Sequence, residues 1–148
     1  MWLWLSPLLP PLAAKNSPAS SFARSRAVAR ELRSRVPAGA PIFVWGFEPS
    51  IYWMAERPAA SRFIYNVPQR TAWRRDESRA TLLRELAAHP PAAIVVQHGD
   101  RIPKVTGDDR DSAGALEAFP ELQRLLVRDF TWAREVRDFD VYVRRQPG

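Results

Sequence analysis

The apolar and polar positions along this 148-residue chain alternate between short apolar runs and longer stretches with helical spacing. Residues 42–45 (IFVW) and 93–97 (AIVVQ) are bounded by proline and glycine, and their β-branched and aromatic content predicts buried strands. Residues 62–65 (RFIY) predict a further strand, after a short helix that begins near residue 48 and ends before Pro58. A strand, a short crossover helix and a second strand are typical of a parallel βαβ unit.

Helical spacing predicts three longer helices. The first begins at Ser17-Pro18, because serine suits the N-cap and proline the first helical position. Its predicted buried face carries Phe22, Ala29, Leu32 and Val36. Its other positions are rich in arginine, which indicates either a solvated face or a surface for anionic membrane or nucleic acid. Further helices are predicted at residues 76–88 and from residue 119 through residue 126.

The C-terminal part of the chain has a different pattern. Residues 98–115 are polar and rich in glycine, which predicts a long loop. Residues 131–145 alternate between apolar and polar positions around Arg137-Asp138, which predicts an antiparallel hairpin. The whole pattern predicts an α/β fold: a small layered domain with a mostly parallel central sheet, flanking helices and a C-terminal β-hairpin. Residues 42–45, 62–65 and 93–97 are its predicted parallel strands.

The first 16 residues differ from the rest of the chain. Residues 1–14 (MWLWLSPLLPPLAA) are apolar and interrupted by proline, and they are shorter than the roughly 20 apolar residues that span a bilayer. We therefore divide the chain into an apolar, proline-rich segment, residues 1–16, and a single α/β domain, residues 17–148. The segment is expected to be either the outer end of a membrane helix or an N-terminal tail. Trp2 and Trp4 suit a membrane–water interface.

The amino-acid composition excludes some kinds of site and favours anionic partners. The chain has no cysteine, which excludes disulfides, thiolate catalysis and cysteine-ligated zinc. The net charge is +6, and arginine supplies nearly all of the positive charge because Lys15 and Lys104 are the only lysines. A basic surface favours anionic partners such as phospholipid head groups, lipid phosphates or nucleic acid.

One stretch resembles a known family. Residues 44–65 (VWGFEPSIYWMAERPAASRFIY) resemble the segment that opens the C-terminal extracytoplasmic domain of bacterial GT-C membrane glycosyltransferases. These enzymes are similar to protein mannosyltransferases and aminoarabinose transferases. The matching positions are Trp45-Gly46, Glu48, Tyr52, Arg57, Ala60-Ser61-Arg62 and Phe63. Residues 118–126 and 139–145 resemble the last helix and the terminal strand of that domain, so the resemblance covers roughly residues 20–145.

This resemblance implies a function. The chain would be a non-catalytic C-terminal domain, or a fragment, of an enzyme that transfers sugar from a polyprenyl-phosphate donor, and it would serve acceptor recognition or cover the active site. In that family the catalytic acidic residues lie in membrane-associated loops, which no stretch here matches, so the chain is expected to be inactive alone and to need no cofactor. Its expected place is the bacterial inner membrane, facing the periplasm or the cell exterior. Its expected partners are the membrane part of the enzyme or the membrane surface, and a glycan or lipid-linked acceptor.

The candidate binding residues come from the resemblance and from two strand ends. They are Trp45, Glu48, Tyr52, Arg57, Arg62, His98 and Asp100. Open α/β sheets bind ligands beyond the carboxyl ends of their strands, where Glu48 and the sequence His98-Gly99-Asp100 are expected. No dinucleotide fingerprint, P-loop or nucleophile elbow occurs, and no catalytic residue is assigned. Asp109 and Asp111 have the spacing of a metal-binding pair, but Asp111-Ser112 better predicts a cap for a following helical turn, so no metal site is assigned.

Two other classes of function remain open. A stand-alone ligand- or phosphate-binding module predicts a pocket at residues 46–48 and 98–111. A basic nucleic-acid-binding protein predicts arginines gathered on one face and binding that weakens with salt. Acidic residues interspersed among the arginines argue against the second class; they include Glu31, Glu77, Glu85 and Asp140.

Overall fold

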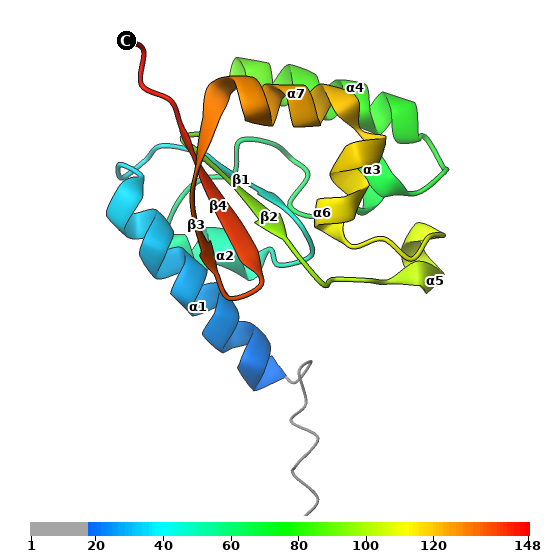
Figure 1. Ribbon diagram of the computed structural model, residues 1–148, viewed down its shortest axis with the longest axis horizontal. Coiled ribbons are helices and arrows are strands. Elements are labelled where there is room, and N and C mark those ends of the chain that lie inside the picture. The colour runs from blue at the N-terminus through cyan, green and yellow to red at the C-terminus, as the bar shows by residue number, and fades with distance from the viewer. Residues whose placement is uncertain (1–17) are drawn as a thin grey trace, which may run out of the picture.

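The computed structural model describes residues 18–148 as one mixed α/β domain (Figure 1). The predicted N-terminal segment, residues 1–16, lies outside the described residues. The elements follow in the order α1 (Pro18–Arg35), β1 (Ile42–Trp45), α2 (Ser50–Ala55), α3 (Val67–Arg70), α4 (Arg75–Ala88), β2 (Ala93–Gln97), α5 (Pro103–Thr106), α6 (Ser112–Ala115), the 3-10 helix η1 (Leu116–Ala118), α7 (Pro120–Asp129), β3 (Phe130–Val136) and β4 (Phe139–Arg144). No helix between residues 18 and 148 has both the length and the apolar character needed to cross a membrane.

The four strands form one sheet in the order β1-β2-β4-β3. β1 and β2 are parallel, β4 is antiparallel to β2, and β3 pairs with β4 as a hairpin whose turn is Arg137-Asp138. The predicted α/β class and C-terminal hairpin are confirmed. The sheet is mixed rather than mostly parallel, because β1 and β2 are its one parallel pair of neighbours within the described residues.

The predicted strand at residues 62–65 is wrong. The chain after α2 makes a single parallel bridge, between Ala59 and Ile42, and then continues through bends. Side chains hold this segment instead of a strand ladder: the Glu85 carboxylate accepts hydrogen bonds from the Ser61 hydroxyl, at 2.6 Å, and from the Arg62 amide, at 3.0 Å. Of the apolar residues that suggested a strand, Phe63 is partly buried, whereas Ile64 and Tyr65 are 42% and 46% exposed. The connection from β1 to β2 therefore runs through α2, α3 and α4.

Two apolar cores lie on opposite faces of the sheet, so the domain has three layers. Alternate strand residues point to opposite faces. Val44 and Val95 pack with residues of α1 and α2, whereas Phe43 and Ile94 pack with residues of α4, α6 and α7. Because both faces are covered, every residue of β1 and β2 is buried, which explains why these strands read as continuous apolar runs.

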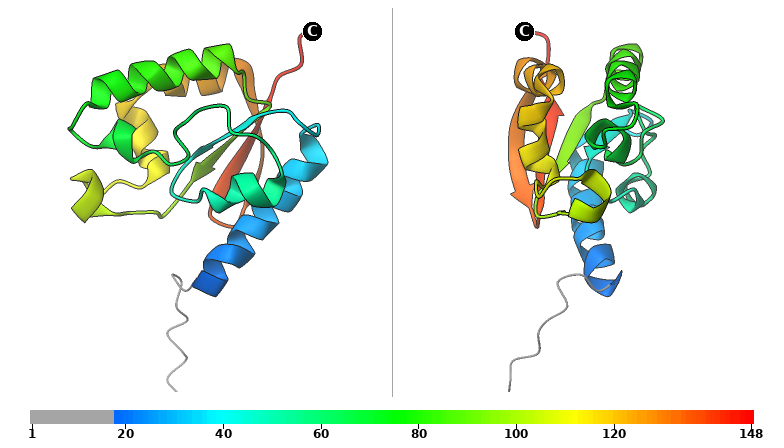
Figure 2. Two further views of the ribbon diagram at one scale, coloured as in Figure 1. Left: turned by 180° about the vertical axis from the view of Figure 1, so that it is seen from behind. Right: turned by 90° about the vertical axis from the view of Figure 1, so that its right-hand side faces the viewer.

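The predicted long helices are confirmed as α1, α4 and α7, and the short one as α2. Residues 98–115 are less irregular than predicted, because they include α5 and α6. One residue of the predicted buried face of α1 is misplaced: Phe22 is 52% exposed, whereas Ala29, Leu32 and Val36 are buried. The first turns of α1 extend beyond the sheet (Figures 1 and 2), and Phe22 lies there on the same side of the helix as the exposed Arg26 and Arg30, whereas Ser25 is fully buried.

Candidate functional site

The parallel strands β1 and β2 place two chain segments side by side, just beyond the carboxyl ends of the strands. Gly46 follows β1 and His98 follows β2. The Phe47 amide donates a hydrogen bond of 2.8 Å to the Gln97 side-chain oxygen. A Cβ at Gly46 would lie 2.6 Å from that oxygen, so glycine is needed for this close approach. We call this region the strand edge: residues 46–48, 97–100 and the buried groups around Ser112.

Glu48 connects the strand edge to the first turns of α1. Its carboxylate accepts hydrogen bonds from the Ser21 hydroxyl at 2.8 and 2.9 Å and from the Ser25 hydroxyl at 3.4 Å. The Arg24 guanidinium forms an ion pair with it at 3.4 Å. These contacts make Glu48 a bridge between two elements and leave its side chain 14% exposed.

Trp45 and Tyr52 are core residues in this structure. The Trp45 indole N–H donates to the Ser112 carbonyl at 2.7 Å, and its ring packs against Phe119. The Tyr52 hydroxyl accepts a hydrogen bond of 2.8 Å from the Val44 amide. Burial raises the pKa of Tyr52, and the Val44 amide only partly offsets that effect. Neither ring is free to stack on a sugar.

Arg57 and Arg62 also have internal partners. Arg57 donates two hydrogen bonds, at 2.7 and 3.2 Å, to the Val36 carbonyl just beyond the end of α1. It thereby caps one of the carbonyl groups that a helix end leaves unpaired. Arg62 forms an ion pair with Glu85 while its own side chain is 71% exposed. Burial acts to raise the pKa of Glu85, but its hydrogen bonds from Ser61 and Arg62 outweigh burial and the pKa is lowered.

His98 and Asp100 do not act as a pair. The His98 Nε2 atom lies 2.6 Å from Asp140 Oδ2, and Asp140 Oδ1 accepts a hydrogen bond of 2.9 Å from the Trp132 indole. Asp100 turns instead to Ser112, whose amide and hydroxyl donate to it at 2.7 and 2.5 Å. The sequence predicted that both side chains lie at the end of β2, but it did not indicate that they hydrogen-bond to different groups.

A buried polar cluster around Ser112 was not found from the sequence. The fully buried Ser112 hydroxyl accepts from Asn66 Nδ2 at 2.7 Å and from Arg70 Nη1 at 3.2 Å. Burial lowers the pKa of Arg70, an effect opposed by Asp100, Asp108 and Asp111, and burial raises the pKa of Asp100. Because Ser112 has no exposed surface and its hydroxyl is engaged, it cannot serve as a nucleophile. The only sequence signal for this cluster is the neighbouring cap residue.

That cap is Asp111, as predicted. Its carboxylate accepts hydrogen bonds of 2.8 Å from the Gly114 amide in α6 and from the Gly99 amide after β2. Burial acts to raise the pKa of Asp111, but these two amides outweigh burial and lower it. Among the described residues, no group of three or more His, Asp or Glu side chains is placed to hold a metal ion.

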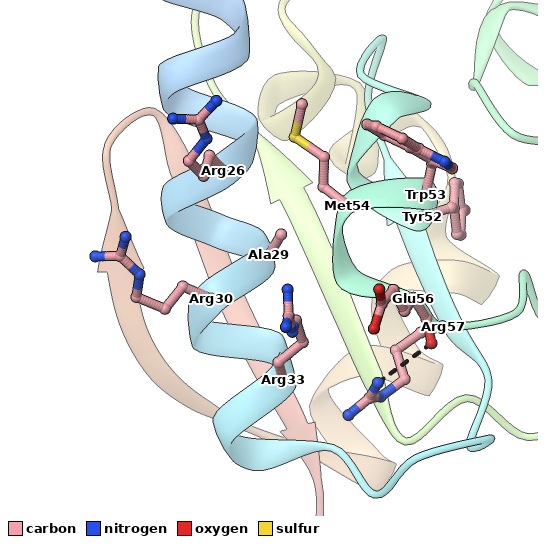
Figure 3. Close-up of a pocket in the computed structure, with 9 residues that line it drawn as sticks. All are labelled: Arg26, Ala29, Arg30, Arg33, Tyr52, Trp53, Met54, Glu56 and Arg57. Atoms are coloured by element: carbon pink, nitrogen blue, oxygen red, sulfur yellow. Dashed lines mark hydrogen bonds between the residues drawn. The ribbon is translucent and has the colours of Figure 1, made fainter.

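A second region that the sequence did not single out is a groove of about 860 Å³ between α1 and α2 (Figure 3). It is lined by Arg26, Ala29, Arg30, Arg33, Tyr52, Trp53, Met54, Glu56 and Arg57. Of the predicted site residues, Tyr52 and Arg57 contribute to this lining. Figure 3 shows Arg33 and Arg57 near the same end of the groove, whereas Arg30 extends from α1 on the side away from α2.

The groove is basic and partly aromatic. Trp53 is 78% exposed, and Arg26, Arg30 and Arg33 are exposed. Within residues 20–148, the side chains of these three arginines form no ion pair or hydrogen bond. Such an arrangement can bind phosphate or carboxylate groups, since guanidinium donates to both. These three guanidinium groups are exposed and can reach a ligand, whereas the charged groups of the strand edge bond to other protein groups.

Comparison with known proteins gives no match: no family model, no curated protein and no solved structure is similar to this chain. The strand edge is a network of groups that engage one another, whereas the groove offers cationic and aromatic side chains to a partner.

Proposed function

We propose that this chain is the non-catalytic extracytoplasmic C-terminal domain of a bacterial GT-C membrane glycosyltransferase that uses a polyprenyl-phosphate sugar. Its role would be to recognise the acceptor or to cover the active site formed by the membrane part. The domain would face the periplasm or the cell exterior at the inner membrane. The sequence resemblance in residues 44–65 is the origin of this proposal.

The main structural support for the proposal is that the resembling residues form hydrogen bonds that join several elements. Glu48 binds the first turns of α1, and Tyr52 binds the β1 backbone. Arg57 caps the end of α1, and Ser61-Arg62 binds Glu85 of α4. Residues at the spacing of the motif thus join β1 and α2 to α1 and α4. The resembling residues thus act as one structural unit, as expected of a segment that opens a domain.

The state of the strand edge supports a role without catalysis. Its two carboxylates are already engaged: Glu48 accepts from serine hydroxyls, and Asp100 accepts from Ser112. His98 bonds Asp140 through Nε2, and its side chain is 42% exposed. A general base has to be free to reach the proton it abstracts. Together with the resemblance, which places the catalytic acidic residues in membrane-associated loops, the engaged carboxylates favour sugar transfer by the membrane part of the larger enzyme.

The position of α1 indicates which end of the domain lies nearest the membrane part. Arg24, in the second turn of α1, forms ion pairs with Glu48 beyond β1 and with Asp138 in the hairpin turn, both at 3.4 Å. The start of α1 therefore lies at the same end of the domain as the carboxyl ends of β1 and β2. If the chain before α1 leads to a membrane part, that part joins the domain next to these strand ends.

The first test is the coding sequence upstream of Met1. The proposal predicts in-frame coding with several apolar stretches of about 20 residues, each long enough to span a bilayer. A start signal at Met1 preceded by a stop codon would contradict it. Where the extended protein exists, sugar transfer from a polyprenyl-phosphate donor should fall when residues 17–148 are deleted, and unchanged transfer would exclude the acceptor and cover roles.

A further inference from the structure

One side of α1 carries a stripe of exposed residues next to the groove. Phe22, Arg26, Arg30 and Arg33 are spaced by four, four and three positions, so they lie along one side of the helix. All four are exposed, and the three arginines also line the groove. Phe22 is the residue whose exposure contradicted its predicted place in the core. We call these four residues, together with Trp53, the basic stripe.

The acids near α1 do not neutralise the stripe. Glu31 pairs with Arg35 and, at 3.6 Å, with Arg134 of the hairpin. Glu48 and Asp138 pair with Arg24. The one acid among the described residues that line the groove is Glu56, against four arginines. The stripe is therefore a site of uncompensated positive charge.

Both aromatic members of the stripe are exposed, as are Trp73 and Trp132 elsewhere on the domain. Trp53 is 78% exposed and Phe22 is 52% exposed. Exposed aromatic rings beside cationic groups are typical of surfaces that lie at a membrane interface, where the ring enters the head-group region and the cation meets lipid phosphate. The apolar lining from Met54 and Ala29 continues this character into the groove.

We propose that the basic stripe docks the domain onto an anionic phospholipid surface. Arg26, Arg30 and Arg33 bind lipid phosphates, while Trp53 and Phe22 enter the head-group layer. A membrane is favoured over nucleic acid because the sequence just before α1, residues 1–14, is apolar and contains two tryptophans. This inference rests on the proposed function in that it takes the membrane as the surface beside the domain, and it adds which residues contact the lipid.

The test is co-sedimentation of the full chain with vesicles. Vesicles of phosphatidylcholine and phosphatidylglycerol in equal parts should bind the chain more tightly than vesicles of phosphatidylcholine alone, and high salt should weaken the difference. A basic residue near an anionic surface strengthens binding about fivefold, so the triple variant R26Q/R30Q/R33Q should bind roughly 100-fold more weakly.

Two matched controls separate docking from general charge and hydrophobicity. The variant R75Q/R101Q/R124Q removes the same charge from exposed arginines outside the groove and should bind much more tightly than the stripe variant. Trp53→Ala should weaken binding, whereas Trp73→Ala, at a tryptophan that is 77% exposed elsewhere, should not. Equal losses in both triple variants would overturn the proposal, as would equal losses in both tryptophan variants.

Two further probes identify the source of the phosphate. Glycerol phosphate and inorganic phosphate should compete weakly with vesicles; if either saturates the groove at the same concentration as lipid, the site binds isolated phosphate and the docking proposal fails. A nucleic-acid oligonucleotide that displaces the chain from anionic vesicles and binds more tightly than they do would also overturn it. Failure here, with membrane-spanning segments still encoded upstream, would leave the proposed function standing.

Discussion

The strand edge and the groove contain similar types of polar residue but use them in opposite ways. At the strand edge, Asp100, Ser112 and Arg70 are buried or partly buried and hydrogen-bond to one another or to neighbouring backbone. In the groove, Arg26, Arg30 and Arg33 are exposed without such partners among the described residues. The comparison teaches that the place where an α/β sheet is expected to bind ligands can be occupied by its own structural network.

The difference follows from the energetics of burial. A buried polar group costs free energy unless it is hydrogen-bonded, and most of the groups at the strand edge bond to one another. Among the described residues, Asn66 Oδ1 and Arg70 Nε are exceptions that are buried without a partner. An exposed arginine keeps its hydration and makes little contribution to stability. Substitutions at the strand edge should therefore change folding, and substitutions in the groove should change binding.

The largest effect on folding is expected for Ser112→Val. The change removes a hydroxyl that bonds to Asp100, Asn66 and Arg70, and it leaves buried polar groups without that partner. Because each buried unsatisfied group costs about 1–3 kcal/mol, we expect the free energy of unfolding to fall by about 3 kcal/mol, measured by urea denaturation. The control Ser34→Ala, at an exposed helix position, should change it by less than about 0.5 kcal/mol. Equal effects of the two changes would show that the cluster is not structural.

The second-largest loss of folding stability is expected for Gly46→Ala. Alanine there would place Cβ 2.6 Å from Gln97 Oε1 and 2.7 Å from Gln97 Cβ, so the two strand ends would have to separate. We expect a loss of about 2 kcal/mol, as for overpacked interiors. Gly39→Ala is the matched control, because Gly39 has a φ of 81° and open space around it. It should cost about 1 kcal/mol from backbone strain alone. A smaller loss at Gly46 than at Gly39 would contradict the close approach.

A smaller and pH-dependent effect is expected for Asp111→Ala. Removing the cap of α6 should cost about 1 kcal/mol at neutral pH. The pKa of Asp111 is lowered in the folded chain, because the Gly99 and Gly114 amides outweigh burial. Its carboxylate therefore stabilises the fold above its ordinary pKa, and this contribution is lost as the pH falls through the lowered value. The stability difference between the original chain and the variant should narrow on acidification, and a difference that widens would contradict the assignment.

The smallest change in folding stability is expected when the arginines of the basic stripe are substituted. The variant R26Q/R30Q/R33Q removes charges that make no internal ion pair among the described residues. Each change should alter the free energy of unfolding by less than about 0.5 kcal/mol, since exposed positions contribute little. Thermal and urea denaturation of the variant should overlay those of the original chain. A loss of several kcal/mol would mean that these arginines are structural, and the contrast between the two regions would disappear.

The sequence predicted most of the fold because its signals there were local. The apolar runs of β1 and β2, the proline starts of α1 and α7 and the alternation of the hairpin each reflect burial within one element. The strand prediction at residues 62–65 failed because Glu85, distant in the sequence, binds Ser61 and Arg62 and sets the path of the chain. Phe22 was misplaced because periodicity cannot show where a helix extends past its sheet.

The candidate site was harder to predict for the same reason. The sequence placed Glu48, His98 and Asp100 near strand ends, but their partners Ser21, Asp140 and Ser112 lie far away in the chain. The groove combines arginines of α1 with Trp53 of α2, and only the packing of the two helices brings them together. Contacts of this kind have no signal in a single sequence.

The most direct test of the contrast is NMR of the tryptophan indole N–H groups during titration with a short-chain phosphatidylglycerol. Trp53 lies in the exposed groove, whereas Trp45 is buried beside the strand edge and bonded to the Ser112 carbonyl. We predict that the Trp53 signal shifts with lipid while the Trp45 signal stays fixed, and that R26Q/R30Q/R33Q abolishes the shift. A shift of Trp45 without one of Trp53 would contradict the account.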